Sequence, residues 1–195
     1  MKIFRMSIGE LKDLRAVIVT GLLIAVSMVI ESFTINLGFA KINFAFLALA
    51  AIGMLYGPSV ALLAGGVCDV VGYLVAPSGG FLPLYTLIGA AQGLIYGLIA
   101  YRRLIQKTGR AFDREMIVRL IAARITDVLI INLICNTAAN FHYGFLRDKT
   151  LGAAIAARVI KNLLELPVDI LLIAGVLIAV LKAYESVFGR QRSAA

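Results

Sequence analysis

The sequence contains little charge. Only 15% of its 195 residues are Asp, Glu, Lys or Arg, whereas 61% are apolar and the mean hydropathy is +0.95. A soluble domain is about a quarter charged and about 45 to 50% apolar, so this chain has too few polar residues to cover a globule in water. We therefore predict a multi-pass protein of the cell membrane. At about 20 residues for each spanning helix, the length allows about six crossings.

The sequence also lacks the residues that several catalytic sites require. His142 is the only histidine, which excludes a metal centre built from several histidines and leaves a Ser-His pair only at the outer membrane edge. No Gly-Lys dipeptide occurs, so a P-loop is absent. We predict no enzymatic activity, no metal and no cofactor. If transport uses ATP, another subunit must hydrolyse it.

Cysteine is scarce, and the amino-terminal segment is not typical of a secretory signal. Cys68 and Cys135 lie far apart inside apolar stretches, where cysteine behaves as a small apolar residue, so we predict no disulfide framework. Residues 1–15 are too charged and too long for a signal peptide and contain no small-residue cleavage site.

The apolar runs predict an all-α bundle of six membrane helices in a single domain, 1–195. Pro58 separates the second run from the third, and the turn residues 77–80 separate the third from the fourth. The predicted helices cover about 16–36, 42–57, 59–76, 81–101, 116–143 and 153–182.

The positions of the basic residues predict the orientation of this bundle. With six crossings, twelve of the 19 Lys and Arg residues fall on one face and three on the other, and the positive-inside rule makes the first face cytoplasmic. The segment 1–15 and the tail 183–195 are then both cytoplasmic. A seven-crossing or re-entrant arrangement around the short second run would break this agreement. The net charge of +8 therefore indicates topology and not a nucleic-acid partner. The twelve are Lys2, Arg5, Lys12, Arg15, Arg102, Arg103, Lys107, Arg110, Arg114, Lys182, Arg190 and Arg192.

Polar residues inside the predicted helices gather toward the extracellular end. Asn132, Asn136 and Asn140 follow one another at a spacing of four and share a helix face. A second stripe, on the last helix, can face the first across a cavity, because a short loop joins the two helices. It consists of Arg158, Lys161, Asn162, Glu165 and Asp169. Amides suit the edge of a heterocycle, and Arg and Lys suit carboxylates or phosphates.

The alternative is that these polar groups bond to one another. Arg158 could pair with Glu165 or Asp169, Lys161 could pair with Glu165, and the asparagines could join helices. In the same way, Asp69 could accept a hydrogen bond from a neighbouring helix, and Arg124 could pair locally with Asp127.

A pair of small residues marks a close helix contact. Gly21 and Ala25 form a small-xxx-small pair on the first helix. Ordinary packing within the chain and docking of another subunit both fit this pattern.

Several segments together resemble the folate family of substrate-binding S components of energy-coupling factor (ECF) transporters. The resemblance covers about residues 16–182, and it is carried by the order and spacing of the motifs. They are GLLIA (21–25), GMLYGP (53–58), GVCDVVG (66–72), APSG (76–79), FLPLYTL (81–87), GLIYG (93–97), NLICNT (132–137) and ARVIKNLLELP (157–167).

The resemblance implies a six-helix subunit that captures a vitamin, most simply folate, from outside the cell. Its partners would be a transmembrane coupling subunit, which packs on Gly21 and Ala25, and two cytoplasmic ATPases. We expect Arg158 and Lys161 to attract the glutamate carboxylates. We expect the asparagines to bind the pterin edge, and Tyr85 or Phe81 to contact the ring faces. The asparagines in question are Asn132, Asn136 and Asn162. A different water-soluble vitamin, or a stand-alone secondary carrier, remains the alternative.

Overall fold

The computed structural model describes residues 2–32, 35–36, 41–42, 44–77, 79–102, 114–146 and 151–188. Within these residues the structure is helical apart from one antiparallel pair of two-residue strands, β1 (Ile35–Asn36) and β2 (Lys41–Ile42). The helices are α1 (Lys2–Glu10), α2 (Leu14–Ser32), α3 (Phe46–Tyr56), α4 (Pro58–Val75), α5 (Pro83–Ala100), α7 (Arg114–Asp127), α8 (Asn136–His142), α9 (Leu151–Leu172) and α10 (Ile178–Phe188). Two π-helical segments join some of them: η1 (Val128–Cys135) and η2 (Ile173–Leu177).

The helix bounds differ from the predicted ones at identifiable places. The first long helix ends at Ser32 and not at residue 36, because Ile35 and Asn36 pair with β2. Helices α7 and α8 continue through η1 over 114–142, and α9 and α10 continue through η2 over 151–188. The expected loop in the basic segment 103–113 lies outside the described residues.

Among the described residues, four helical stretches have the length and hydropathy to cross a membrane. They are Leu14–Glu31, Pro58–Val75, Pro83–Ala100 and Ile155–Tyr184. Helix α3, with 11 residues, is apolar but shorter. The six crossings and the cytoplasmic termini therefore stay predictions.

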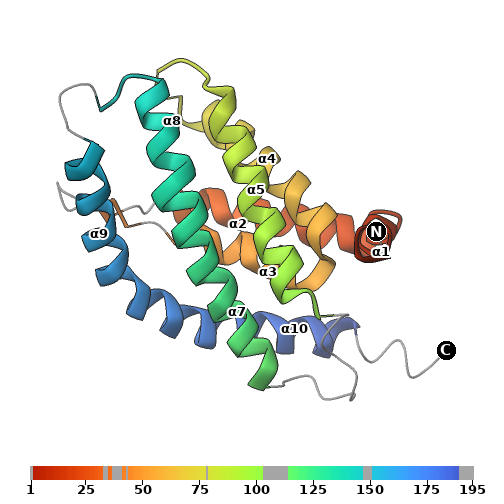
Figure 1. Ribbon diagram of the computed structural model, residues 1–195. Helices are drawn as coiled ribbons and strands as arrows, with labels where there is room; N and C mark the ends of the chain where they lie inside the picture. Colours follow the sequence, from red (N-terminus) through yellow and green to blue (C-terminus); the bar gives the residue numbers. More distant parts are fainter. Residues whose placement is uncertain are drawn as a thin grey trace.

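Helix α3 is the centre of the apolar core. All of its residues are buried, as expected for a helix that is apolar all round. Residues of α4, α5, α7, η2 and α10 pack around it in one cluster, including Tyr96, Leu120, Leu177 and Leu181. Figure 1 shows that α9 runs along one side of the bundle and that α10 then crosses beneath α3. Pro167 and η2 lie within this curved helix, and both features bend helices.

Helices α4 and α5 approach each other through glycine. A Cβ atom at Gly65 would overlap the carbonyl oxygen of Gly89, and one at Gly93 would overlap that of Ala61. The backbones of α4 and α5 can come this close only because these two residues have no side chain. The contact fixes the two helices that form one wall of the cavity described below.

We predict that Gly65→Ala destabilises the protein, because the new methyl group must displace the backbone of α5. The expected cost is about 1 to 3 kcal/mol. Gly66→Ala is the matched control, since the nearest atom to its Cβ is Thr86 Cγ2 at 3.8 Å. Thermal unfolding of the two purified variants in detergent measures the difference, and equal midpoints would contradict the glycine contact.

Helix α1 is a structural element that the sequence analysis did not predict. Its Ser7 hydroxyl donates to the carbonyl oxygen of Tyr56 at 2.7 Å and accepts from the backbone N–H groups of Ser59 and Val60 at 2.9 and 3.2 Å. Ser7 therefore satisfies the free N–H groups at the start of α4, as an N-cap residue would. The chain turns there at Gly57, whose φ of 83° favours glycine.

Candidate ligand-binding cavity

A cavity of about 830 Å³ opens at the end of the bundle opposite the α3–α4 turn. It is lined by the carboxyl-terminal parts of α2 and α4, the start of α5, the helix 114–142, and α9. This volume lies within the range of about 300 to 1,000 Å³ that is usual for small-molecule sites. The polar lining side chains are Ser27, Glu31, Asp69, Tyr73, Tyr85, Gln92, Arg124, Asn132, Asn140, Lys161 and Glu165.

Arg124 lies at the boundary between the cavity and the apolar core, where it joins three helices. Its guanidinium donates to Asp127 Oδ2 at 2.7 Å on its own helix and to Asp169 Oδ2 on α9 at 2.8 and 3.0 Å. Tyr96 and Gln92 of α5 donate to the same Asp127 oxygen at 3.2 and 3.1 Å. We call these five residues the Arg124 network.

The three charged side chains of the Arg124 network are buried almost completely. The side chains of Arg124, Asp127 and Asp169 are 6%, 0% and 3% exposed. The guanidinium carbon also lies 3.8 Å from the centre of the Phe46 ring, so its face is covered by α3. A buried charge is costly unless it is paired and hydrogen-bonded, and both conditions are met for this cation. The sequence predicted the local Arg124–Asp127 pair, which is confirmed, but not the contact with Asp169.

We predict that Arg124→Gln strongly destabilises the protein, because it leaves two aspartates buried without their cation. Loss of one partner from a buried ion pair costs about 3 to 5 kcal/mol. Arg119→Gln, on the same helix, removes an exposed pair with Glu115 and should cost less than about 1 kcal/mol. Calorimetric unfolding in detergent compares the two variants. An equal loss in both would show that the network contributes no more than a surface pair.

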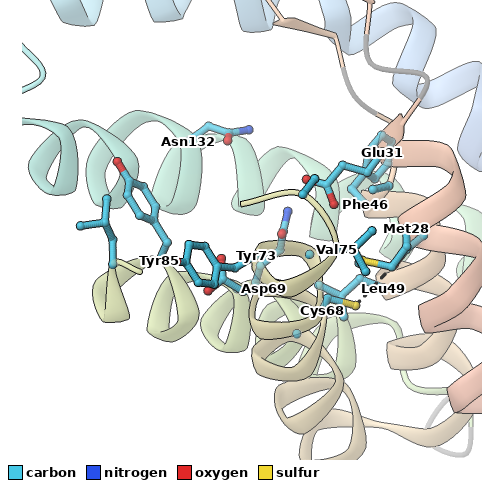
Figure 2. A pocket seen from close by; sticks show the side chains of 18 of the residues that line it. Met28, Glu31, Phe46, Leu49, Cys68, Asp69, Tyr73, Val75, Tyr85 and Asn132 are labelled. Atoms are coloured by element: carbon cyan, nitrogen blue, oxygen red, sulfur yellow. Dashed lines mark hydrogen bonds between the residues drawn. The ribbon is translucent and has the colours of Figure 1, made fainter. Parts of the chain in front are cut away.

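Four of the seven predicted ligand-binding residues line the cavity. They are Lys161, Asn132, Tyr85 and Phe81. Tyr85 donates to Asn140 Oδ1, and its ring stacks on Tyr143 with centroids 5.8 Å apart. Figure 2 shows Tyr85 and Asn132 entering the cavity from α5 and η1.

The other three, Arg158, Asn136 and Asn162, are not among the lining residues. Asn132 Nδ2 donates to Asn162 Oδ1, and Asn136 Nδ2 donates to Asn132 Oδ1, both at 3.3 Å. Asn162 in turn donates to the backbone oxygen of Arg158 at 2.8 Å, and Arg158 Nη1 donates to that of Asn132 at 3.1 Å. The alternative of helix-to-helix bonding is therefore confirmed for Asn132 and Asn162, whereas Asn136 bonds within its own helix. The two bonds of Asn132 with α9, to Asn162 and from Arg158, hold η1 and α9 together at the cavity.

Two ion pairs involve charged residues of α9: one lies within the helix and the other joins it to α7. Lys161 Nζ lies 3.5 Å from Glu165 Oε1, which confirms the expected local pair. Asp169 bonds Arg124 instead of Arg158.

Three acidic residues of the lining were not predicted as ligand-binding: Glu165, which pairs with Lys161, and Asp69 and Glu31. Asp69 of α4 accepts a hydrogen bond from Thr86 of α5 at 2.5 Å, as the structural alternative expected, but it also faces the cavity. Glu31 reaches the cavity from the end of α2 and lies against α4, since a Cβ atom at Gly72 would be 3.6 Å from its Oε2. A carboxylate in an apolar helix was the available signal for Asp69 and Glu31.

Gly21 and Ala25 lie on an exposed face of α2. A Cβ atom at Gly21 would have no neighbour within 4 Å, and Leu22 beside it is 63% exposed. Packing within the chain therefore does not explain this small pair.

These features fit the class of helical membrane proteins that have a polar cavity of the size usual for small-molecule sites, and they leave an apolar helix face uncovered. Residues 15–179 match the family described as "ECF transporter, substrate-specific component", and the chain belongs to this family. The resemblance noted in the sequence is thereby confirmed. The protein is accordingly a multi-pass membrane protein and a substrate-binding subunit.

Individual relatives are named folate transporters. The chain is 25% identical over 166 residues to the folate transporter FolT of Clostridium novyi (strain NT), covering 85% of this chain and 89% of the relative. It is 27% identical over 158 residues to the FolT of Leuconostoc mesenteroides, with 81% and 82% covered. A crystal structure of FolT bound with folic acid is similar with a TM-score of 0.64 and 29% sequence identity, over 81% of this chain and 89% of that one.

Proposed function

We propose that this protein is the substrate-capture subunit of an ATP-driven ECF uptake transporter, and that its substrate is a folate. The observation that carries the proposal is the cavity of about 830 Å³ in a chain similar to FolT bound with folic acid. Its lining combines aromatic rings with groups that bind polar edges and carboxylates.

The two ends of the described bundle support the proposed orientation. The cavity lies at one end, and α1, the α3–α4 turn, the end of α5 and α10 meet at the other, where Tyr101 donates to Glu10 at 3.2 Å and Arg102 lies over the Tyr184 ring. The second end contains most of the described basic residues, and it would face the cytoplasm by the positive-inside rule. The cavity would then open to the outside.

We propose that Lys161 and Arg158 attract the glutamate carboxylates of the ligand. Lys161 lines the cavity, and Arg158, which is not a lining residue, donates to the backbone oxygen of the lining residue Asn132. Tyr85 and Phe81 offer ring faces for stacking. Asn136 and Asn162 support Asn132 through their hydrogen bonds.

We predict that the purified protein binds folic acid and does not bind thiamin, riboflavin, biotin or pantothenate comparably. Isothermal titration in detergent measures all five. Heat with another vitamin and none with folic acid would contradict the proposed substrate. In liposomes we expect bound ligand but no net uptake without ATPase subunits, and uptake by the protein alone would favour a secondary carrier.

We also propose that Gly21 and Ala25 form the contact with a transmembrane coupling subunit. Because Gly21 has free space around it, we predict that Gly21→Leu leaves folding and folic-acid affinity unchanged but abolishes copurification of the coupling subunit and ATPases. Gly152→Leu is the matched control, since Gly152 on α9 also has no neighbour within 4 Å. Copurification that is equal in both variants would rule out this contact.

A further inference from the structure

Polar bonds fix helix α1 to the end of the bundle opposite the cavity. Ser7 bonds to the turn between α3 and α4. The Ser59 hydroxyl donates to the backbone oxygen of Phe4 at 3.2 Å, and the Tyr101 hydroxyl donates to Glu10 Oε1 at 3.2 Å. Ser7 and Glu10 are therefore buried although they are polar. These bonds determine which side of α1 faces the bundle and which side faces outward.

The outward side of α1 carries an apolar stripe. Phe4, Ile8 and Leu11 follow one another at spacings of four and three, so they share a helix face, and they are 38% to 52% exposed. Leu11 belongs to the turn after α1, where its N–H donates to the carbonyl oxygen of Ile8 at 3.1 Å. Further along the chain, the exposed residues Leu14 and Ile18 begin α2, which has the length and hydropathy to cross a membrane.

Basic side chains border this stripe. Lys2, Arg5 and Lys12 are exposed, and no ion pair in the described part of the chain includes them. At about 100° for each residue, Arg5 and Lys12 lie on the side of the stripe that is turned away from the buried face. The apolar stripe therefore lies between the side of α1 that packs on the bundle and the side that carries the basic residues.

The acidic residues of the same segment do not offset this charge on α1. Glu10 is buried against Tyr101. Asp13 follows α1, and its Oδ1 accepts the N–H of Arg15 at 3.0 Å at the start of α2. The exposed charge of α1 is therefore entirely basic.

The position of α1 places these two sides at a membrane surface. Figure 1 shows α1 at the outer edge of the molecule beside the start of α2, with α1 seen nearly along its axis and α2 seen from the side. Because α2 crosses the membrane in this family of proteins, α1 runs along the membrane surface. With nine residues it is too short to span. A helix with one apolar and one basic side lies in the interface between acyl chains and headgroups.

We propose that α1 binds anionic phospholipids, with Phe4, Ile8 and Leu11 among the acyl chains and the basic side at the headgroup phosphates. Lys2, Arg5 and Lys12 donate charged hydrogen bonds to these phosphates, and their apolar stems cover the adjoining stripe. In the proposed orientation the lipids belong to the cytoplasmic leaflet, whose surface is negative. The inference goes beyond the capture of a substrate and does not depend on which substrate is bound.

The first test measures the depth of α1 in a bilayer. The sequence contains no tryptophan, so a single introduced indole reports its own surroundings. Phe4→Trp places the indole on the apolar stripe. Gly9→Trp is the matched control on the same helix, because Gly9 lies outside the stripe and a Cβ atom there has no neighbour within 4 Å. Both full-length variants are reconstituted into bilayers of phosphatidylcholine and phosphatidylglycerol in equal amounts, with bromine on the acyl chains as a contact quencher.

We expect bromine to quench Phe4→Trp at least about two-fold more strongly than Gly9→Trp, since only the stripe enters the acyl layer. Equal quenching in the two variants, or none in either, would overturn the insertion of α1. Absence of quenching at the stripe would indicate that a protein partner covers it. If Phe4→Trp does not fold, Ile8→Trp tests the same stripe.

The second test measures the preference for anionic lipid in the same bilayers, with bromine on only one of the two lipids at a time. We expect the indole of Phe4→Trp to report a relative affinity for phosphatidylglycerol over phosphatidylcholine of about five-fold for each basic residue engaged, which corresponds to about 1 kcal/mol. Adding Lys2→Gln, Arg5→Gln and Lys12→Gln together should abolish the preference. The matched control, Lys2→Arg with Arg5→Lys and Lys12→Arg, keeps the charge and should retain it.

The outcomes separate this inference from the proposed substrate. Equal quenching by the two brominated lipids, or a preference that survives the three glutamine substitutions, would overturn the binding of anionic lipid by α1. Folic acid is titrated against the same preparations. A protein that shows both lipid results but binds no folic acid would contradict the proposed substrate and would leave the role of α1 supported.

Discussion

The buried bonds of Arg124 are the constraint on which the cavity depends. One guanidinium joins Asp127 on its own helix to Asp169 on α9, while Tyr96 and Gln92 of α5 complete the acceptor side. In a low-dielectric interior these groups cannot separate without leaving a buried charge unpaired, so the helices must meet at the Arg124 network. On one side of the Arg124 network lies the apolar core around α3. On the other side the helices enclose the polar cavity.

The π-helical segments begin directly after this network. Segment η1 starts at Val128, one residue after Asp127, and η2 starts at Ile173, four residues after Asp169. A π segment shifts the helix face that follows, and such segments occur often at functional sites. Beyond η1's start, Asn132 lies on the face toward α9 and the cavity, where it bonds Asn162. Arg124 connects the helix 114–142 to α9 at the base of the cavity. The bond between Asn132 and Asn162 connects the same two helices nearer the cavity mouth.

Local spacing predicted much of this arrangement, but contacts between distant segments did not follow from it. The pairs Arg124–Asp127 and Lys161–Glu165 lie within one helical turn, so the sequence alone indicates them. The partner of Arg124 at Asp169 is 45 residues away and depends on how α7 packs on α9. Helix α1 was missed for a related reason. It is too polar for a membrane helix, and its role depends on Ser7 meeting a turn about fifty residues further along.

Helix α2 connects the two surfaces that the proposed function needs. Glu31 at its end lines the cavity, and Gly21 lies ten residues earlier, about 15 Å along the same helix axis, on the exposed face. One side of α2 packs on the α3 core through Ala16, Val19 and Leu23, which fixes its position. Because a helix is rigid over this length, the position of Glu31 at the cavity determines the position of the face that carries Gly21. In the proposed function, α2 would therefore serve both the binding of the ligand and the docking of the coupling subunit.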